Sequence, residues 1–446
     1  MTTPAIAKKN NTRSNNLSSF RRDPIAFLRQ MAKEQGDWAT FPIGPYPCVL
    51  INDPQAIFDL LVTNSKNVEK GPGLLRTGPL LGDGLLTADT ATHGRRRSRV
   101  QPAFSRAMIL GYATAMVECA QTMSGCWKRG DTLDIHREMN RLTLGIIGET
   151  LFKADLDEEA GEVGEALTTA LYSLYDRLRP QAASNEQRSA AREAFPRAQA
   201  RLQHIVDRLV SERRDSGTPD DEDKSLIALL LREDAGDGDL ALTETQIRDE
   251  AMTFFLAGHE SVANALTWTW YALSQSPECA AQFYGELDEA LGGQPPCYDD
   301  LARLPYTRRL LMESMRLYPP AWMVSRRAHT DCEVGGHSLP AGTIAIAAQC
   351  VTHSDPRYYA NPNGFDPDRW LTQRAMPRRS LTYFPFGAGP RACIGEQFAW
   401  TELILLLAAL GQRWKLDLAP GHPVEMEPIV TLRPKFGLQM TLRARF

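Results

Sequence analysis

The stretch FPFGAGPRACIGEQFA, from Phe384 to Ala399, combines two glycines, a proline, an arginine and a cysteine immediately before a long apolar run. A β-strand does not tolerate so many breakers, and a helix can begin only after them. The sequence therefore predicts a rigid loop that brings Cys393 to the threshold of a helix starting near Ile394–Glu396.

Cys393 has two readings. A lone cysteine is usually buried and inert. Here, however, Gly387 and Gly389 allow the backbone to take positive φ or to approach a flat partner closely. The charge of Arg391, the absence of a side chain at Gly395 and the N-terminus of the following helix favour a thiolate. A thiolate beside a flat partner describes an axial ligand of haem iron, which these residues favour over an inert cysteine.

The composition is that of a large globular protein, with 446 residues, 43% hydrophobic and 23% charged. The net charge of −4 argues against a nucleic-acid binder and against a basic membrane-surface protein. The eight cysteines are scattered, without a CxxC pair or zinc-like spacing, and we expect no disulfide framework. We expect no signal peptide or membrane anchor, because the polar N-terminus lacks an apolar core and the apolar run at 403–410 is short.

The periodicity predicts a mainly α fold with small β-sheets, organised as a flexible segment over residues 1–20 and a single domain over 21–446. Short β-like runs occur at 38–44 and 47–53, and a leucine-rich loop at 69–89 either packs on the core or lines an apolar pocket. The longest helical pattern begins at Thr243, where Gln246 completes a capping box, and ends before Pro277. Such a helix is roughly 50 Å long.

Three further motifs are ambiguous when each is taken alone. Glu313 and Arg316 share one helix face, but such pairs are usually exposed and contribute little. Gly258 lies in the middle of the longest helix, where glycine is unfavourable, so it is either tolerated or permits a local widening of the helix. His93 and Arg97 are spaced by four in an arginine run that is typical of a solvated helix face.

The loop Phe386-x-x-Gly389-x-Arg391-x-Cys393-x-Gly395 resembles the haem-binding loop of the cytochrome P-450 superfamily. The other motifs occur in the order of that family, so the resemblance covers nearly the whole chain. It implies a mainly α fold with small sheets, in which haem b lies between the long central helix and the cysteine loop. It also implies that the Cys393 thiolate is the axial ligand of the haem iron.

By the same resemblance, Glu313-x-x-Arg316 corresponds to the family's E-x-x-R motif, with Arg369 in FDPDRW as the third member of a structural network. The haem propionates would be bound by four residues: His93, Arg97, Arg326 and Arg391. Arg327 is the less favoured alternative to Arg326, and Arg95, Arg96 and Arg99 are expected to be solvated.

The segment Ala257-Gly258-His259-Glu260-Ser261 resembles the family's site of oxygen activation. Glu260 and Ser261 correspond to an acid–alcohol pair that relays protons while the O–O bond is broken. Serine stands where threonine is commoner, which leaves the hydroxyl more rotamers and makes coupling leakier. The side chain of His259 is expected to point away from the haem.

The function that the resemblance implies is a monooxygenase that inserts one oxygen atom of O₂ into a C–H bond or an alkene of a lipophilic fatty acid, terpenoid or steroid. Electrons would come from separate proteins, a ferredoxin or flavodoxin and its reductase, because no flavin or NADPH domain is expected. We expect a cytoplasmic monomer that binds neither nucleic acid nor membrane. The candidate substrate pocket is formed by Leu74, Leu75, Leu85, Leu86, Phe254, Phe255, Val324 and Leu432.

Two alternatives remain. A peroxide-driven peroxygenase or an isomerase would need no electron supply, but relatives of that kind tend to lose the acid–alcohol pair that Glu260 and Ser261 resemble. A non-enzymatic haem sensor or carrier usually has a regulatory domain, and the sequence shows no sign of one.

Overall fold

The computed structural model describes residues 10–156, 160–178, 185–217, 223–232, 241–372 and 381–445. Helices dominate, with small sheets beside them, as the sequence predicts. None of the helices within these ranges is long and apolar enough to cross a lipid bilayer.

The strands form four small sheets. A five-stranded sheet has the order β1-β2-β8-β5-β3, in which only the β2–β8 pair is parallel. The other sheets are β4-β12-β9, β10-β11 and β6-β7. The strand bounds are β1 Trp38–Ile43, β2 Tyr46–Ile51, β3 Val68–Lys70, β4 Thr132–Asp134, β5 Val324–Ala328, β6 Cys332–Val334, β7 His337–Leu339, β8 Ile344–Ala347, β9 Trp414–Leu418, β10 Met426–Pro428, β11 Leu432–Pro434 and β12 Gln439–Ala444.

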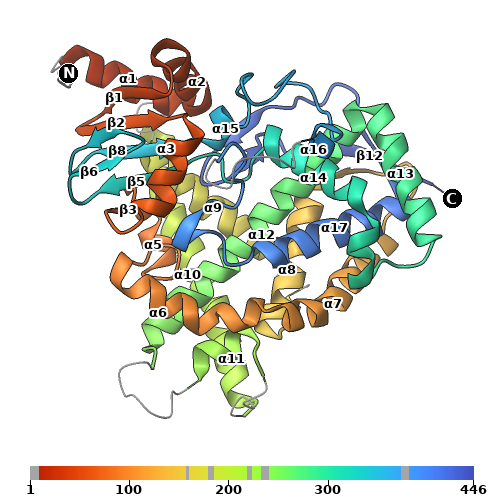
Figure 1. The fold of residues 1–446 in the computed structure, drawn as a ribbon. Helices are drawn as coiled ribbons and strands as arrows, with labels where there is room; N and C mark the ends of the chain where they lie inside the picture. The colour runs from red at the N-terminus through yellow and green to blue at the C-terminus, as the bar shows by residue number, and fades with distance from the viewer. Residues whose placement is uncertain are drawn as a thin grey trace.

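The five-stranded sheet lies with the N-terminal helices at one corner of the molecule, at the upper left of Figure 1, and the longer helices fill the remainder. The first helices are α1 Asn10–Arg22, α2 Pro24–Gln35, α3 Pro54–Phe58, α4 Pro72–Leu75, α5 Gly78–Leu81, α6 Thr90–Val100, α7 Arg106–Gly125 and α8 Ile135–Ile147. The later ones are α9 Ala160–Leu178, α10 Asn185–Asp215, α11 Leu226–Leu231, α12 Glu244–Gln275, α13 Pro277–Leu291, α14 Pro305–Leu317, α15 Gln349–Thr352, α16 Arg369–Thr372 and α17 Glu396–Arg413. Two π-helices (Asp59–Thr63 and Gly148–Phe152) and three 3₁₀ segments (Gln101–Phe104, Tyr298–Arg303 and Gly389–Arg391) complete this part of the chain.

Helix α12 is the long central helix that the sequence predicts. Thr243 caps it through a complete capping box with Gln246, and the next helix begins at Pro277. Most of its residues are buried, because α8, α14 and α17 pack around it. Its position through the middle of the helical part of the molecule is visible in Figure 1.

The sheet separates two apolar clusters, as strand alternation requires. Leu50 of β2 faces a cluster with α2 residues such as Phe27, whereas Val49 and Ile51 face the opposite cluster around Ile57 of α3. A third and larger cluster joins the helices, including α7, α8, α12 and α17. The sheet and the helical part therefore bury separate surfaces.

The N-terminal segment differs in part from the expectation of a flexible stretch over residues 1–20. Residues 1–9 lie outside the described ranges, but α1 begins at Asn10. The ring of Phe20 packs edge-to-face on Phe27 at 5.9 Å, and the amide of Asn16 donates to the carbonyl of Pro42. These two contacts dock α1 on α2 and β1. The polar composition of the segment gives no sign of this docking.

Candidate active site

The loop before α17 has the positive φ angles that its glycines predict, but Gly389 is also required by a contact with another part of the protein. Gly387 and Gly389 have φ values of 71° and 74°, in the region that favours glycine. A Cβ on Gly389 would lie 2.1 Å from the carbonyl oxygen of Leu61. The glycine at 389 thus allows the loop to approach a π-helix of the protein itself, and not only a cofactor. The Cys393 amide donates to the carbonyl of Phe386 at 2.9 Å, which closes the loop.

The Cys393 side chain is exposed, yet the surrounding protein is dense enough for burial to raise the pKa of its thiol to about 11. Both observations agree if the sulfur faces a space inside the protein. A hydrogen bond from the Gly395 backbone and the charge of Arg97 oppose the rise. The expectation that Arg391 supplies the charge beside the sulfur is therefore wrong. The Arg391 guanidinium turns instead to the carbonyl of Ala88, at 3.0 Å.

The space faced by Cys393 lies between the loop and α12. Phe104 marks its edge, because its ring stacks on Phe254 of α12 and its Cε1 lies 3.7 Å from where a Cβ on Gly395 would be. On α12, Ala257 is exposed although residues 251–256 are buried. Ala257, like Cys393, is therefore exposed to a space although the residues before it on α12 are buried.

Five basic side chains share one electrostatic neighbourhood beside this space. Burial, followed by the charges of Arg391, Lys70, Arg97 and Arg326, lowers the pKa of His93 to about 4. Burial and the charge of Arg391 likewise lower the pKa of Arg326 to about 10. Burial, with the charges of Arg391 and Arg326, lowers the pKa of Lys70 to about 6. Clustered buried cations repel each other unless an anion lies among them. The four predicted propionate residues are thus brought together, with Lys70 as an unpredicted fifth.

The neighbouring arginines have distinct partners. Arg97 Nη1 donates to the carbonyl of Ala392 at 2.7 Å and so holds the residue before the cysteine. Arg327 is half exposed and pairs with Glu69 at 3.0 Å, which leaves Arg326 as the inward-facing member of that arginine pair.

Arg96 is not solvated, contrary to the expectation from the arginine run. It is buried, and its guanidinium contacts Asp83 at 2.7 Å and Glu250 of α12 at 3.4 Å. Arg96 and Glu250 are separated by 154 residues in sequence, so a local pattern could not reveal their ion pair. Arg99 likewise donates to the carbonyl of Leu229, which anchors α6 to α11.

Glu260 is held by Arg433 of β11 and by Thr431, which directly precedes that strand. Its Oε1 accepts from Arg433 Nη2 and from the Thr431 hydroxyl, each at 2.9 Å. Asn264, one turn further along α12, donates to the same threonine and contacts His136 Nε2 at 3.0 Å. The carboxylate of the predicted acid–alcohol pair therefore belongs to a buried polar network.

Gly258 does not widen the helix, because α12 runs as an unbroken α-helix from 244 to 275. A Cβ at Gly258 would lie 2.6 Å from Cδ1 of Ile147, so the glycine allows α8 to pack closely on α12. The Ser261 hydroxyl donates to the carbonyl of Ala257 at 3.0 Å. His259 is buried, with Nδ1 at 2.8 Å from the carbonyl of Phe255.

The Glu313 carboxylate lies between two guanidiniums, as the sequence predicts. Arg316 contacts it at 2.8 Å and Arg369 at 2.9 Å, and the Trp370 indole donates to it at 3.0 Å. Glu313 and Arg316 have no exposed surface, and Arg316 also donates to three backbone carbonyls. Such a fully bonded buried network fixes the chain segments around it.

The predicted substrate residues lie in different surroundings. Leu432 is completely buried in the sheet-side cluster, and Phe255 packs on Phe152, so neither side chain reaches the space by Ala257. The others are nearer to it or more accessible: Phe254 stacks on Phe104, Leu85 is buried, Leu74, Leu86 and Val324 are half-buried, and Leu75 is 45% exposed.

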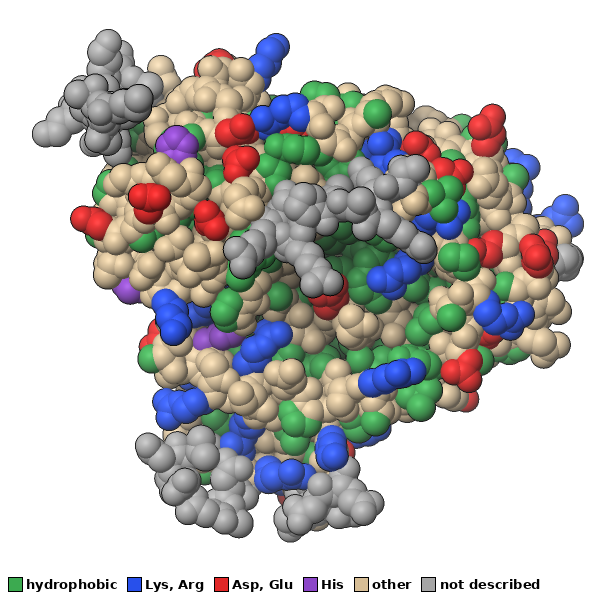
Figure 2. Space-filling model, viewed as in Figure 1, with side chains coloured by type: hydrophobic (Ala, Val, Ile, Leu, Met, Phe, Trp, Pro, Cys, Tyr) green, Lys and Arg blue, Asp and Glu red, His purple; other side chains and the backbone are tan. Residues whose placement is uncertain are grey.

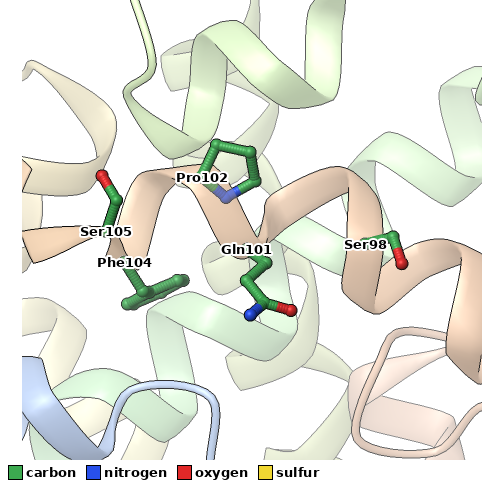
Figure 3. A pocket seen from close by; sticks show the side chains of 5 residues that line it. All are labelled: Ser98, Gln101, Pro102, Phe104 and Ser105. Atoms are coloured by element: carbon green, nitrogen blue, oxygen red, sulfur yellow. The ribbon is translucent and has the colours of Figure 1, made fainter.

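Two recesses of about 370 and 400 Å³ lie on the outer side of Phe104. Figure 3 shows Phe104 and Gln101 on the same side of the short helical turn after α6, with Pro102 on the other. Neither recess includes Cys393 or Ala257 among its lining residues.

Comparison with known proteins agrees with this geometry. The family model described as Cytochrome P450 matches residues 13–440. The chain belongs to the cytochrome P450 family.

Three bacterial relatives of this P450 are similar over most of their length. Cyclooctatin synthase of Streptomyces melanosporofaciens is 36% identical, over 92% of this chain and 89% of that protein. Cyclooctat-9-en-7-ol 5-monooxygenase of the same species is 33% identical, over 90% and 86%. Pentalenene oxygenase of Streptomyces avermitilis is 32% identical, over 95% and 94%. This P450 is accordingly an oxidoreductase of the monooxygenase type.

P450 proteins imply haem bound through a cysteine thiolate, and the residues of this chain fit that group. Cys393 is exposed although the protein around it is dense, and the two propionates would offset the mutual repulsion of the basic side chains around His93. Lys70 and Arg433 are charged members of this site that the motifs miss. For Lys70 a signal existed, since it shares a face of β3 with the buried Val68.

Proposed function

We propose that this P450 binds haem b with Cys393 as the axial thiolate and oxygenates a lipophilic terpenoid. The observation that carries the proposal is the enclosed Cys393 sulfur between α12 and a cluster of basic side chains. When bound, a thiolate-ligated haem supplies O₂ activation, in which one oxygen atom enters the substrate and the other leaves as water. Two electrons and two protons balance that reaction.

The chain positions the cofactor through four predicted residues. Arg97 fixes the cysteine loop through the carbonyl of Ala392, and with Arg326 and Arg391 it provides positive charge for the propionates. The neutral imidazole of His93 can add a hydrogen-bond donor. The network of Glu313 is linked to the start of that loop, because Arg316 donates to the carbonyl of His353 and His353 Nε2 accepts from the Phe384 amide at 3.0 Å. In this proposal these residues bind and orient the haem, and none of them takes part in the reaction.

Glu260 and Ser261 are proposed to deliver protons. The Ser261 hydroxyl at the exposed turn of α12 can exchange its bond to the Ala257 carbonyl for one to a reacting oxygen. The Glu260 carboxylate is engaged with Arg433 and Thr431, so it must leave at least one of them to pass a proton on. Arg433 thus controls when the carboxylate is available.

The substrate proposal rests on the apolar walls and on the relatives. Phe254 precedes Ala257 by three residues on α12, and Leu86 and Val324 are half-buried apolar side chains, so such a wall would suit a substrate without charge. The relatives are named for cyclooctatin, cyclooctat-9-en-7-ol and pentalenene, which favours a cyclic terpenoid over a fatty acid or steroid.

Electrons are proposed to come from a ferredoxin or flavodoxin with its reductase. Figure 2 shows Lys and Arg side chains along the lower part of the viewed face, over α6 and α7, with few carboxylates among them. A basic surface of this kind steers an acidic electron carrier. Arg97 of α6 donates to the carbonyl of Ala392, so a carrier docked over α6 would meet a helix that contacts the cysteine loop.

The test is a spectral screen of the purified protein against a terpenoid, fatty-acid and steroid library. We expect a 450-nm band for the reduced CO complex that is lost in Cys393→Ser, a type I shift with terpenoids, and product only with NADH, a redox partner and its reductase. Turnover with H₂O₂ alone would favour a peroxygenase. An unchanged 450-nm band in Cys393→Ser would refute the ligand assignment.

A further inference from the structure

Lys70 is a buried lysine at the edge of the candidate haem site. It ends strand β3 and lies directly opposite Arg326 of β5 in the antiparallel register. Alternation along the strand points Val68 and Lys70 to the same side, and they are only 2% and 7% exposed. Lysine is almost never buried to this extent unless its charge is paired.

The polar contacts of Lys70 do not provide that pairing. Its ammonium group donates to the carbonyl of Leu85 at 3.2 Å, and within the described ranges no carboxylate forms an ion pair with it. An ammonium group has three donors, so two remain. The nearest carboxylate that influences it, Glu250, already accepts from the Leu85 amide at 2.9 Å and pairs with Arg96.

The remaining charged neighbours are repulsive. Arg326 and Arg391 both act on Lys70, and all three act on His93. A group of buried cations with spare donors is a site for an anion, and the only anion that the family's cofactor brings to this side is its propionate pair.

We infer that Lys70 is a further ligand of a haem propionate, and that the same ammonium group, through the carbonyl of Leu85, ties the leucine-rich loop to the cofactor. The inference rests on the haem binding proposed above. The carbonyl of Leu85 is held by Lys70 and its amide by Glu250, so this residue of the loop is fixed between β3 and α12. Lys70 is a binding and positioning residue and takes no part in the reaction.

The competing explanation is structural, in which Lys70 serves only the carbonyl of Leu85. The two explanations differ in one respect that can be measured. A propionate ligand matters only when the cofactor carries free propionates, whereas a loop anchor matters equally for an esterified haem.

The experiment measures the rate of haem transfer from the holoenzyme to apomyoglobin for the wild type, Lys70→Met and Lys70→Arg, with Lys66→Met as the control at an exposed lysine. Each protein is loaded once with haem and once with haem dimethyl ester. With haem, we expect Lys70→Met to lose the cofactor at least about ten-fold faster than the wild type, as for other hydrogen bonds to charged groups. Lys70→Arg should fall between them, and Lys66→Met should match the wild type.

With the dimethyl ester, the rates of cofactor loss from the wild type and from Lys70→Met should agree within about two-fold. Changing both the protein and the cofactor forms a double-mutant cycle, which isolates the interaction between Lys70 and the propionate. The same acceleration with both cofactors, or none with haem, would overturn the inference while leaving haem binding intact. If Lys70→Met does not fold, the propionate bending band of Lys70→Arg in resonance Raman replaces it. A shifted band supports the inference, and an unshifted one overturns it. A wild type without haem would overturn the proposed function itself.

Discussion

The ion pair between Glu260 and Arg433 offers the sharpest test of the active-site network. The pair is 2.9 Å long, and its side chains are only 8% and 5% exposed. Arg433→Leu leaves the carboxylate buried with the hydroxyl of Thr431 as its remaining partner. Removing one member of a buried pair costs about 3–5 kcal/mol of unfolding free energy, because the other charge stays uncompensated.

The double variant Arg433→Leu with Glu260→Gln removes both charges at once. Its loss of stability should be smaller than the sum of the single losses by about 2 kcal/mol or more, which measures the coupling of the pair. A matched control is Lys435→Leu, because Lys435 and Glu425 form a pair of similar length with both side chains exposed. That control should change stability by no more than about 1 kcal/mol.

The assay is urea unfolding followed by far-UV circular dichroism at pH 7 for the wild type and each variant. The reasoning would be refuted by an Arg433→Leu effect no larger than that of Lys435→Leu, or by strictly additive single and double variants. In turnover, Arg433→Leu should also raise the share of reducing equivalents that end as H₂O₂, measured by peroxide release per NADH, because the carboxylate of the proposed relay is no longer held.

Three further predictions concern packing and charge. Gly258→Ala should lower the free energy of unfolding by about 1–3 kcal/mol, because the new Cβ overpacks against Ile147 Cδ1 at 2.6 Å. Adding Ile147→Val removes that Cδ1 atom and should restore part of the lost stability in chemical denaturation. The absence of any rescue would contradict the packing role. Burial without a hydrogen-bond partner raises the pKa of Glu402 well above its usual 4.5, so the folded protein keeps a proton that the unfolded chain releases. Wild-type stability should therefore fall as pH rises above 4.5, by up to about 1.4 kcal/mol per pH unit, and Glu402→Gln should gain an advantage that grows from pH 5 to pH 8, whereas parallel pH curves would contradict it. Glu313→Gln should cost about 3–5 kcal/mol and lower the haem content of the purified protein, measured by the pyridine haemochrome assay, and full haem content at wild-type stability would contradict the network's role.

Features set by close neighbours in sequence were predictable. The capping box of Thr243 and Gln246 and the start of α17 at Glu396 depend on side chains within four residues of each other. The spacing of glycines before Cys393 acts over the same range. For such elements, the local chemistry and the final structure impose the same requirement.

Partners that meet only in the folded chain were not predictable. Arg433 lies 173 residues after Glu260, and nothing near either residue signals the pair. The role of Gly258 is a similar case, because a helical glycine fits both a widened turn and a close helix contact. Only the position of Ile147 on α8 decides between the two.

The backbone of Leu85 is fixed by side chains of other residues, through its own amide and its own carbonyl. Neither bond involves the leucine side chain, so both survive when that side chain is exchanged. The loop therefore separates two tasks: Lys70 and Glu250 set the path of the chain, and the residues along it set the shape of the apolar wall. If the proposed substrate pocket is lined by this loop, variation at Leu85 and Leu86 would reshape it while the course of the backbone is kept.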